Sequence, residues 1–266
     1  MQVRWDHLTP PEFKALVRNE KLCIVPMGSL ERHGEHMPYG TDALVAHAIA
    51  VGAAEMEPCV VFPPYWFGQV HEASCFTGAI NFPTRLLLEM LEVLLDQISH
   101  NGFTKILILN GHGGNTDFLR YFAMSQLDRE VPYTLYIGNA GSGERMKEVS
   151  KQWETDGGHA DESETSTVMA ILPGLVKMEY HKFEEPILPN RDISHLKAHT
   201  GLWWYAMYPE QVTGCPSKAT REKGERVFEA AKADVADLIR SIKDDTIVPE
   251  MQQEFYRRVR EVRDAE

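Results

Sequence analysis

Four short apolar runs, each followed by a turn-forming segment and then by residues at helical spacing, constrain the fold of this chain more than any other feature. The runs are Leu22–Met27, Cys59–Pro63, Lys105–Asn110 and Tyr133–Gly138. Strands that alternate with helices in this order form βα units around a largely parallel sheet. The sequence therefore predicts an α/β sandwich with a mainly parallel sheet flanked by helices.

Helical patterns fill the segments between and beyond these runs. Thr84–Gly102 carries apolar residues at helical spacing, and Asn115–Leu127 starts with an asparagine that can cap a helix. Thr9–Glu12 combines a capping pattern with two prolines, which predicts an early helix. Ser217–Lys243 predicts a long amphipathic helix, and Met251–Glu266 a charged surface helix. Because no repeat or low-complexity linker interrupts the chain, we expect a single domain over residues 1–266.

Charge and composition exclude several classes of partner. The chain has 266 residues, with 27 Lys and Arg against 39 Asp and Glu, so its formal net charge is −12. Such a field repels phosphate backbones and anionic membranes, and we expect neither nucleic acid nor a membrane as partner. The four cysteines lie far apart without a C-x-x-C pair, which argues against a disulfide framework. The sequence has no signal-peptide pattern and no long apolar stretch, which predicts a cytoplasmic protein.

Potential metal ligands are concentrated in the segment GSLERHGEHMPYGTD at residues 28–42, directly after the first apolar run. Loops at the carboxyl ends of strands form the ligand crevice of such sheets. Glu31 and His33 are two residues apart and point to the same side of an extended segment, and a turn over Pro38–Gly40 can bring Asp42 alongside them. Imidazole and carboxylate groups together suit Zn²⁺, Mn²⁺ or Fe²⁺. A solvated polar loop is the alternative interpretation.

A second candidate site, NGHGGN at residues 110–115, also follows a predicted strand. Its glycines permit a tight turn, and His112 is the side chain in it that is suited to metal binding. A glycine-rich turn before a helix can instead hold phosphate with its backbone amides. The segment has neither the Lys-Ser/Thr ending of a P-loop nor G-x-G-x-x-G spacing, so we favour metal binding.

The third segment, GGHADESETS at residues 157–166, precedes another apolar run. Asp161 and Glu162 fit the start of a helix, where a capping side chain and early carboxylates stabilise the helix dipole. His159 follows two glycines, and this position suits a mobile acid/base group better than a packed core residue.

Together these segments resemble the motifs of the creatininase (creatinine amidohydrolase) family. The matching patterns are GSxExHGxHxPxxTD at 28–42, NGHGGN at 110–115, HAxxxETS at 159–166 and GxPxxATxxKG at 214–224. They occur in the family's order over about residues 20–225. The resemblance implies a parallel sheet flanked by helices, metal-dependent hydrolysis of C–N bonds in small amides, and assembly into homo-oligomers, often hexamers.

The resemblance also implies a ligand set for two divalent ions per chain. Carried over by position, Glu31 and His112 bind one ion, His33 binds the other, and Asp42 bridges both. Creatininase itself has a glutamate ligand where this chain has Gly114, so the second ion lacks a ligand. Water, Glu164 or the substrate would fill that position, or else the second ion is bound weakly.

The mechanism that we expect is attack on an sp² carbon by a hydroxide that bridges the two ions. A bound metal lowers the pKa of water from 15.7 toward about 7. His159 is the candidate to protonate the leaving nitrogen, with Glu164 or Glu35 orienting it or shuttling the proton.

Substrate-binding residues are less constrained by the sequence. Relatives often carry Glu-His where this chain has Glu72-Ala73, so His71 is displaced by one position, and specificity is expected to differ. Among the aromatic residues, Trp66 is favoured to contact substrate because it follows a predicted strand. Three further tryptophans in loop-like surroundings are weaker candidates: Trp153, Trp203 and Trp204. His195 and His199 are interpreted as surface or interface residues, since no third ligand lies near them.

Three functions remain open at this point. The leading one is hydrolysis of an amide, cyclic amide or formamide C–N bond. The second keeps the metals but opens the ring of an oxidised cyclitol of the 3-dehydro-scyllo-inosose type. The third is a non-catalytic metal-binding protein on the same scaffold, which Gly114 favours and which His159 and Glu164 argue against.

Overall fold

A four-stranded parallel sheet forms the centre of the computed structural model, which describes residues 1–155 and 157–264. The strand order is β2-β1-β3-β4, and every neighbouring pair is parallel. The strands are β1 (Leu22–Met27), β2 (Val60–Val61), β3 (Lys105–Asn110) and β4 (Thr134–Asn139). All four predicted runs therefore form strands, although the second strand is much shorter than its apolar run.

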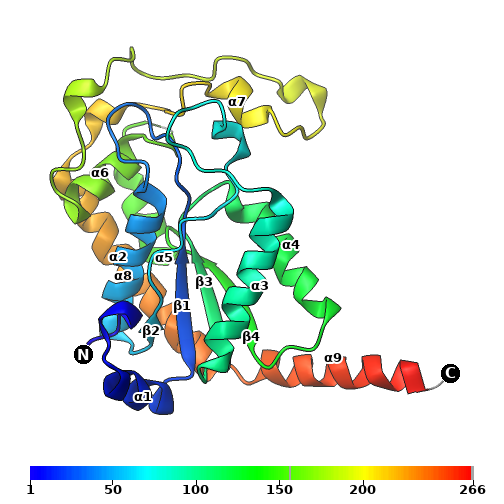
Figure 1. Cartoon of the computed structure of the whole chain (residues 1–266). Helices are drawn as coiled ribbons and strands as arrows, with labels where there is room; N and C mark the ends of the chain where they lie inside the picture. The colour runs from blue at the N-terminus through cyan, green and yellow to red at the C-terminus, as the bar shows by residue number, and fades with distance from the viewer. Residues whose placement is uncertain (156, 265–266) are drawn as a thin grey trace.

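Helices cover both faces of this sheet (Figure 1). The α-helices are α1 (Pro10–Asn19), α2 (Thr41–Met56), α3 (Thr84–His100), α4 (Asn115–Ser125), α5 (Glu144–Val149), α6 (Glu162–Ile171), α7 (Trp203–Met207), α8 (Arg221–Asp244) and α9 (Ile247–Asp264). The 3₁₀ helices are η1 (Trp5–His7), η2 (His71–Ala73), η3 (Gln126–Asp128), η4 (Ser150–Gln152), η5 (Met178–Tyr180), η6 (Ser194–Leu196) and η7 (Pro216–Lys218). The α/β sandwich predicted from the sequence is confirmed.

The core lies in two layers because alternate side chains of each strand point to opposite faces. On one face, Val25 and Ile108 of the strands pack with Leu91 of α3 and Phe122 of α4. On the other face, strand residues pack against α2 and α8, which contribute many alanines and so approach the sheet closely. The strands are consequently buried on both sides, as parallel strands usually are.

The ends of several helices follow local sequence rules. Thr9 and Glu12 form a capping box before α1, as predicted. The α8 helix begins after Thr220, whose Oγ1 accepts the backbone N–H of Lys223, so the residues at 217–220 are not part of it. Asn115 does not cap α4 as expected. Its buried side chain instead accepts the backbone N–H of Gln69 over 2.8 Å, which ties α4 to the loop after β2.

Close contact between α6 and α8 depends on Gly224. A Cβ atom built on this glycine would lie 1.9 Å from the backbone oxygen of Ser166. The two helices therefore cross with their backbones in contact, and this contact fixes the position of α6 beside the sheet.

The α9 helix extends away from the body of the molecule (Figure 1), in agreement with the prediction of a surface helix. Tyr256 anchors it, because this side chain is buried against the segment after α4. No helix among residues 1–155 and 157–264 is both long and apolar enough to span a bilayer. All four cysteines are free thiols, as expected from their spacing.

Candidate metal centre

The site is assembled at the carboxyl ends of β1 and β3. Met27 and Asn110 are paired in register as the last residues of these neighbouring strands. The loop with Glu31 and His33 leaves β1 at this point, and His112 lies two residues beyond β3. The loop after β1 then turns back into α2, whose first turn carries Asp42. Parallel strand pairing thus brings together the first two motifs, which are far apart in sequence.

Glu31, Asp42 and His112 form the first group of potential ligands. All three are buried, and His112 Nδ1 lies 2.8 Å from Glu31 Oε1 and 3.1 Å from Asp42 Oδ2. The other ring nitrogen, Nε2, lies 2.7 Å from the backbone oxygen of Gln69. Since a carbonyl oxygen only accepts hydrogen bonds, Nε2 carries the proton and Nδ1 is left with a lone pair toward the carboxylates. A metal-binding histidine has this arrangement.

His33, Asp42 and Glu164 form the second group. His33 Nδ1 donates to the backbone oxygen of Glu31 over 3.2 Å, so Nε2 carries the lone pair. This Nε2 atom lies 3.1 Å from Asp42 Oδ1 and 3.6 Å from Glu164 Oε2. The two oxygens of Asp42 therefore face different histidines, and Ser29 Oγ fixes the carboxylate by donating to Oδ2 over 2.7 Å.

The electrostatics of both groups favour a bound cation. Burial opposes a charge on His33, but the surrounding carboxylates, that of Asp42 first, outweigh burial and raise its pKa to about 10. The same balance raises the pKa of His112 well above its usual value. Burial would raise the pKa of Asp42, but the two histidines hold it well below its ordinary range. This cluster of buried carboxylates thus attracts positive charge, which the histidines supply when protonated and a metal ion supplies otherwise.

Ligand geometry supports the same conclusion. Within each group, one ligand atom from every residue lies within 4.8 Å of the others. Among the described residues, Glu31 Oε1 is a buried carboxylate oxygen without a hydrogen bond of good geometry. A buried anionic oxygen without a partner is costly, and coordination of a cation removes that cost. The residues present therefore fit divalent ions.

His159 is buried beside these groups and forms a third group of potential ligands with Glu31 and His33. Its ring stacks on that of His33 with centroids 4.3 Å apart, and Nε2 donates to the backbone oxygen of Arg32 over 2.9 Å. Nδ1 faces Glu31 Oε1 at 3.9 Å. Burial and the neighbouring His33 lower the pKa of His159. The ring also meets the edge of Trp204, so it is enclosed by contacts, and the mobility expected from the two preceding glycines stays a prediction.

Glu164 enters the site from the first turn of α6. Its Oε2 accepts the backbone N–H of Ala160 over 2.7 Å, and Ala160 itself has a positive φ of 51°. Burial raises the pKa of Glu164 to about 7, although the nearby His33 acts in the opposite direction. Asp161 caps α6 by accepting the N–H groups of residues 163 and 164, as its position in the sequence suggested.

Gly114 cannot contribute a ligand, and the structure explains why it is a glycine. A Cβ atom at this position would lie 2.5 Å from His112 Nε2 and 2.9 Å from the backbone oxygen of Gln69. A side chain here would disrupt the hydrogen bond that orients His112. Glu164 is the third potential ligand of the second group. It is one of the three alternatives given above for the ligand that Gly114 does not supply.

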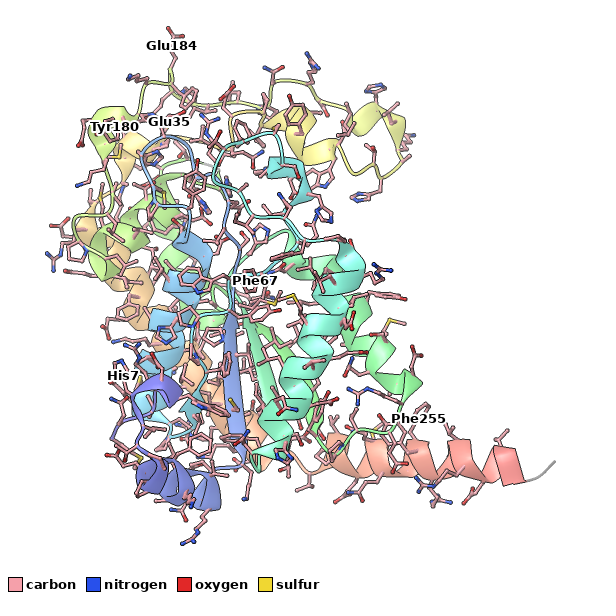
Figure 2. The ribbon with its side chains drawn as sticks, in the orientation of Figure 1. His7, Glu35, Phe67, Tyr180, Glu184 and Phe255 are labelled. Atoms are coloured by element: carbon pink, nitrogen blue, oxygen red, sulfur yellow. The ribbon has the colours of Figure 1, made fainter. Side chains whose placement is uncertain are left out.

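Three of the other predicted site residues lie outside the ligand groups. Glu35 is half-exposed and forms an ion pair with Arg32, and Figure 2 shows it on the loop at the top of the molecule. The ring of Trp66 packs against Gly40 and fills the space that a side chain at residue 40 would need. His71 is exposed and lies 3.2 Å from Thr84 Oγ1. The structure therefore does not bring these three side chains to the candidate metal centre.

Glu72 does line a cavity beside the ligands. This cavity has a volume of about 440 Å³ and also contacts Glu31, Asp42, His112, His159, His199, Trp203 and Trp204. From the sequence, Trp203 and Trp204 were only weaker candidates for substrate contact, and His199 was interpreted as a surface or interface residue. The segment that carries all three, residues 181–215, shows no periodic pattern. Figure 1 shows α7, which carries both tryptophans, above the carboxyl ends of the strands.

Comparison with known proteins identifies relatives of this chain by sequence and by fold. The family model for creatininase, described as creatinine amidohydrolase, matches residues 6–239. A 3-dehydro-scyllo-inosose hydrolase of Thermotoga maritima is 26% identical over 90% of this chain and 83% of its own length. A creatinine amidohydrolase of Pseudomonas putida is 25% identical over 88% of this chain and 94% of its own.

A similar fold is found in a crystal structure of a Bacteroides fragilis protein assigned as a creatinine amidohydrolase. It is 28% identical, with a TM-score of 0.78, and the match covers 93% of this chain and 99% of that protein. The sequence resemblance, the fold and the family match all agree. The chain belongs to the creatininase family, whose members are metal-dependent hydrolases.

Proposed function

We propose that this protein is a metal-dependent hydrolase that cleaves the C–N bond of an amide, cyclic amide or formamide in a small molecule. The observation that carries this proposal is the position of Asp42. One of its oxygens faces His33 and the other faces His112, as expected of a carboxylate that bridges two ions. The creatinine amidohydrolase relative, whose name describes cleavage of an amide-type bond, supports the choice of reaction.

Two of the three groups of potential ligands share Asp42, and we propose that these two hold the ions. Glu31 and His112 complete the first set, while His33 and Glu164 complete the second. Zn²⁺, Mn²⁺ and Fe²⁺ all accept such mixtures of imidazole and carboxylate. When bound, the ions supply a water of lowered pKa at neutral pH and polarise the substrate carbonyl.

Residues of the chain then transfer a proton from the attacking water to the leaving nitrogen. His159 has its Nε2–H committed to the Arg32 carbonyl, so only Nδ1 is available toward the site. We propose that Nδ1 accepts a proton from the attacking water and delivers it to the leaving nitrogen. Glu164 lies close enough to His33 to hold the second ligand set in place. The geometry favours Glu164 over Glu35 for this supporting role, because Glu35 pairs with Arg32 instead.

The first test is the metal content per chain, measured by elemental analysis of protein purified without chelators. We expect about two ions in the wild type and a sharp loss in Asp42→Ala, because the shared ligand is removed. Asp117→Asn is the matched control, since Asp117 is an exposed carboxylate on the rim of the same cavity. One ion per chain would restrict the mechanism to a mononuclear centre. No metal, even after incubation with Zn²⁺, Mn²⁺ or Fe²⁺, would overturn the proposal.

Ring opening of an oxidised cyclitol is the alternative reaction. The named activity of the Thermotoga maritima relative supports it, and the same ligand sets would serve it. Parallel assays on cyclic amides and cyclic ketones, with the metal-loaded protein, distinguish the two reactions. A homo-oligomeric state and a cytoplasmic location stay predictions, which sedimentation and fractionation of the native cells would test.

A further inference from the structure

The candidate metal ligands border two cavities. The first, called here the tryptophan cavity, is the one of about 440 Å³ lined by Trp203 and Trp204. The second has a volume of about 660 Å³ and is called here the loop cavity, because the loop after β4 with Gly141 lines it. Both cavities are lined by Asp42, His112 and Glu164. A group held at the ligands is therefore adjacent to both cavities.

The tryptophan cavity has a fixed aromatic wall. Trp204 Nε1 donates to Gln211 Oε1 over 3.0 Å, and the ring meets His159 edge-on at 5.6 Å. Trp203 lies 5.5 Å from Trp204 but remains 43% exposed, so part of its ring is free. A free indole beside an anchored one is a suitable surface for a flat group of a ligand.

The loop cavity has a different character and no part in the proposed mechanism. It extends from the loops after β3 and β4 to the α6 and α8 helices, with Ser142, Thr167 and Val227 in its lining. Each cavity alone is within the range of about 300–1,000 Å³ found for small-molecule sites. A single small ring bound at the metals would leave one of the two cavities unfilled.

We infer that the physiological substrate is an open-chain amide with a substituent on each side of the scissile bond. A flat substituent lies against Trp203 in the tryptophan cavity, and the other substituent lies in the loop cavity. Hydrolysis adds the hydroxyl of water to the acyl carbon and its proton to the nitrogen, so the acid and the amine that form each have their substituent in a different cavity. This inference rests on the proposed function and narrows its substrate class.

Hydroxamic acids test this inference because their two oxygens chelate metals. Their substituents on the carbonyl carbon and on nitrogen correspond to the two substituents of an amide. The probes are acetohydroxamate, benzohydroxamate and N-phenylbenzohydroxamate, titrated calorimetrically into the metal-loaded protein. Burial of a phenyl ring contributes about 1.5–3 kcal/mol, so benzohydroxamate should bind at least about tenfold more tightly than acetohydroxamate. N-Phenylbenzohydroxamate, with a ring for each cavity, should bind at least as tightly as benzohydroxamate.

Two glycines allow each cavity to be narrowed separately. Gly201 lines the tryptophan cavity and Gly141 the loop cavity, and a Cβ atom on either meets nothing within 4 Å. Gly201→Phe and Gly141→Phe should each weaken the binding of N-phenylbenzohydroxamate at least about tenfold, which is the affinity that burial of one ring contributes. Both should leave acetohydroxamate binding unchanged. Tyr205→Ala is the matched control, since Tyr205 is an exposed aromatic residue of α7 outside both cavities.

The results separate this inference from the proposed function. If acetohydroxamate binds but the N-phenyl compound binds much more weakly than benzohydroxamate, the site has room on one side only and the inference is wrong. It is equally wrong if neither glycine variant affects the N-phenyl compound. If the protein holds no metal and acetohydroxamate does not bind, the proposed function fails, and the inference fails with it.

Discussion

His112 is oriented by Gln69, whose backbone oxygen accepts the Nε2–H of the imidazole over 2.7 Å. This bond crosses from the loop after β3 to the loop after β2, and it leaves the Nδ1 lone pair directed at Glu31 and Asp42. A second hydrogen bond to the same loop, from the Gln69 N–H to Asn115, holds the carbonyl in place. The geometry of these potential ligands therefore depends on residues outside the ligand groups.

Gly114→Ala should weaken metal binding. The added Cβ would lie 2.5 Å from His112 Nε2, so either the ring or the Gln69 carbonyl has to move. Loss of such an orienting hydrogen bond typically costs about 10–100-fold in metal affinity. Competition with a chelator of known affinity would measure the change. Gly113→Ala is the control on the neighbouring residue, because its Cβ meets nothing within 4 Å. Equal metal affinity in the two variants would contradict the role given to the Gln69 bond.

His159→Ala should keep its metal but lose most of its turnover. Its imidazole lies beside the ligand groups without belonging to either of the sets built around Asp42, and removal of a positioned general acid costs about 10²–10⁴-fold in rate. The measurement is kcat on the amide that substrate screening returns, together with the metal content of the same sample. His195→Ala serves as the control, since this histidine is exposed on η6. Full activity in His159→Ala would show that another group carries the proton.

The sheet and the central ligands were predictable because they depend on local patterns. Buried parallel strands read as continuous apolar runs, and their carboxyl ends meet at one edge of the sheet. Glu31, His33 and Asp42 share one loop and the helix turn after it, so a single segment of sequence nearly defines their arrangement. The approach of His112 follows from the pairing of β1 with β3.

Contacts between distant loops were not predictable from spacing. Trp204 contacts His159 from the long connecting segment over residues 181–215, where the apolar residues show no helical or strand periodicity. The contacts of His159 have the same origin, because its ring meets the Arg32 carbonyl and the ring of His33, which are distant in sequence. Asn115 has the local pattern of a helix cap, but its side chain instead accepts a hydrogen bond from the backbone N–H of Gln69. In each case a long-range partner outweighs the local preference.

Glu164→Ala should lower the metal content from about two ions per chain to about one, because this carboxylate completes one of the two ligand sets. The set of Glu31, Asp42 and His112 is unchanged in this variant, so one ion should remain. Elemental analysis checks the number directly. Glu144→Ala, which removes an exposed carboxylate at the start of α5, is the control. A Glu164→Ala protein with both ions would exclude Glu164 as a ligand and leave water or substrate in that position.

Gly224→Ala should destabilise the protein, because the new methyl group would lie 1.9 Å from the Ser166 oxygen and force α6 away from α8. Overpacking of this kind costs about 1–3 kcal/mol, which exceeds the gain of about 1 kcal/mol from replacing glycine by alanine within a helix. Urea unfolding of the two proteins measures the difference. Gly52→Ala in α2 is the matched control, since the atoms that its Cβ would meet belong to the flexible side chain of Lys232, which can move. We therefore expect Gly52→Ala to be neutral or stabilising and Gly224→Ala to be destabilising. Equal stability of the two variants would mean that the close contact between α6 and α8 is relaxed without cost, and that the position of Glu164 does not depend on it.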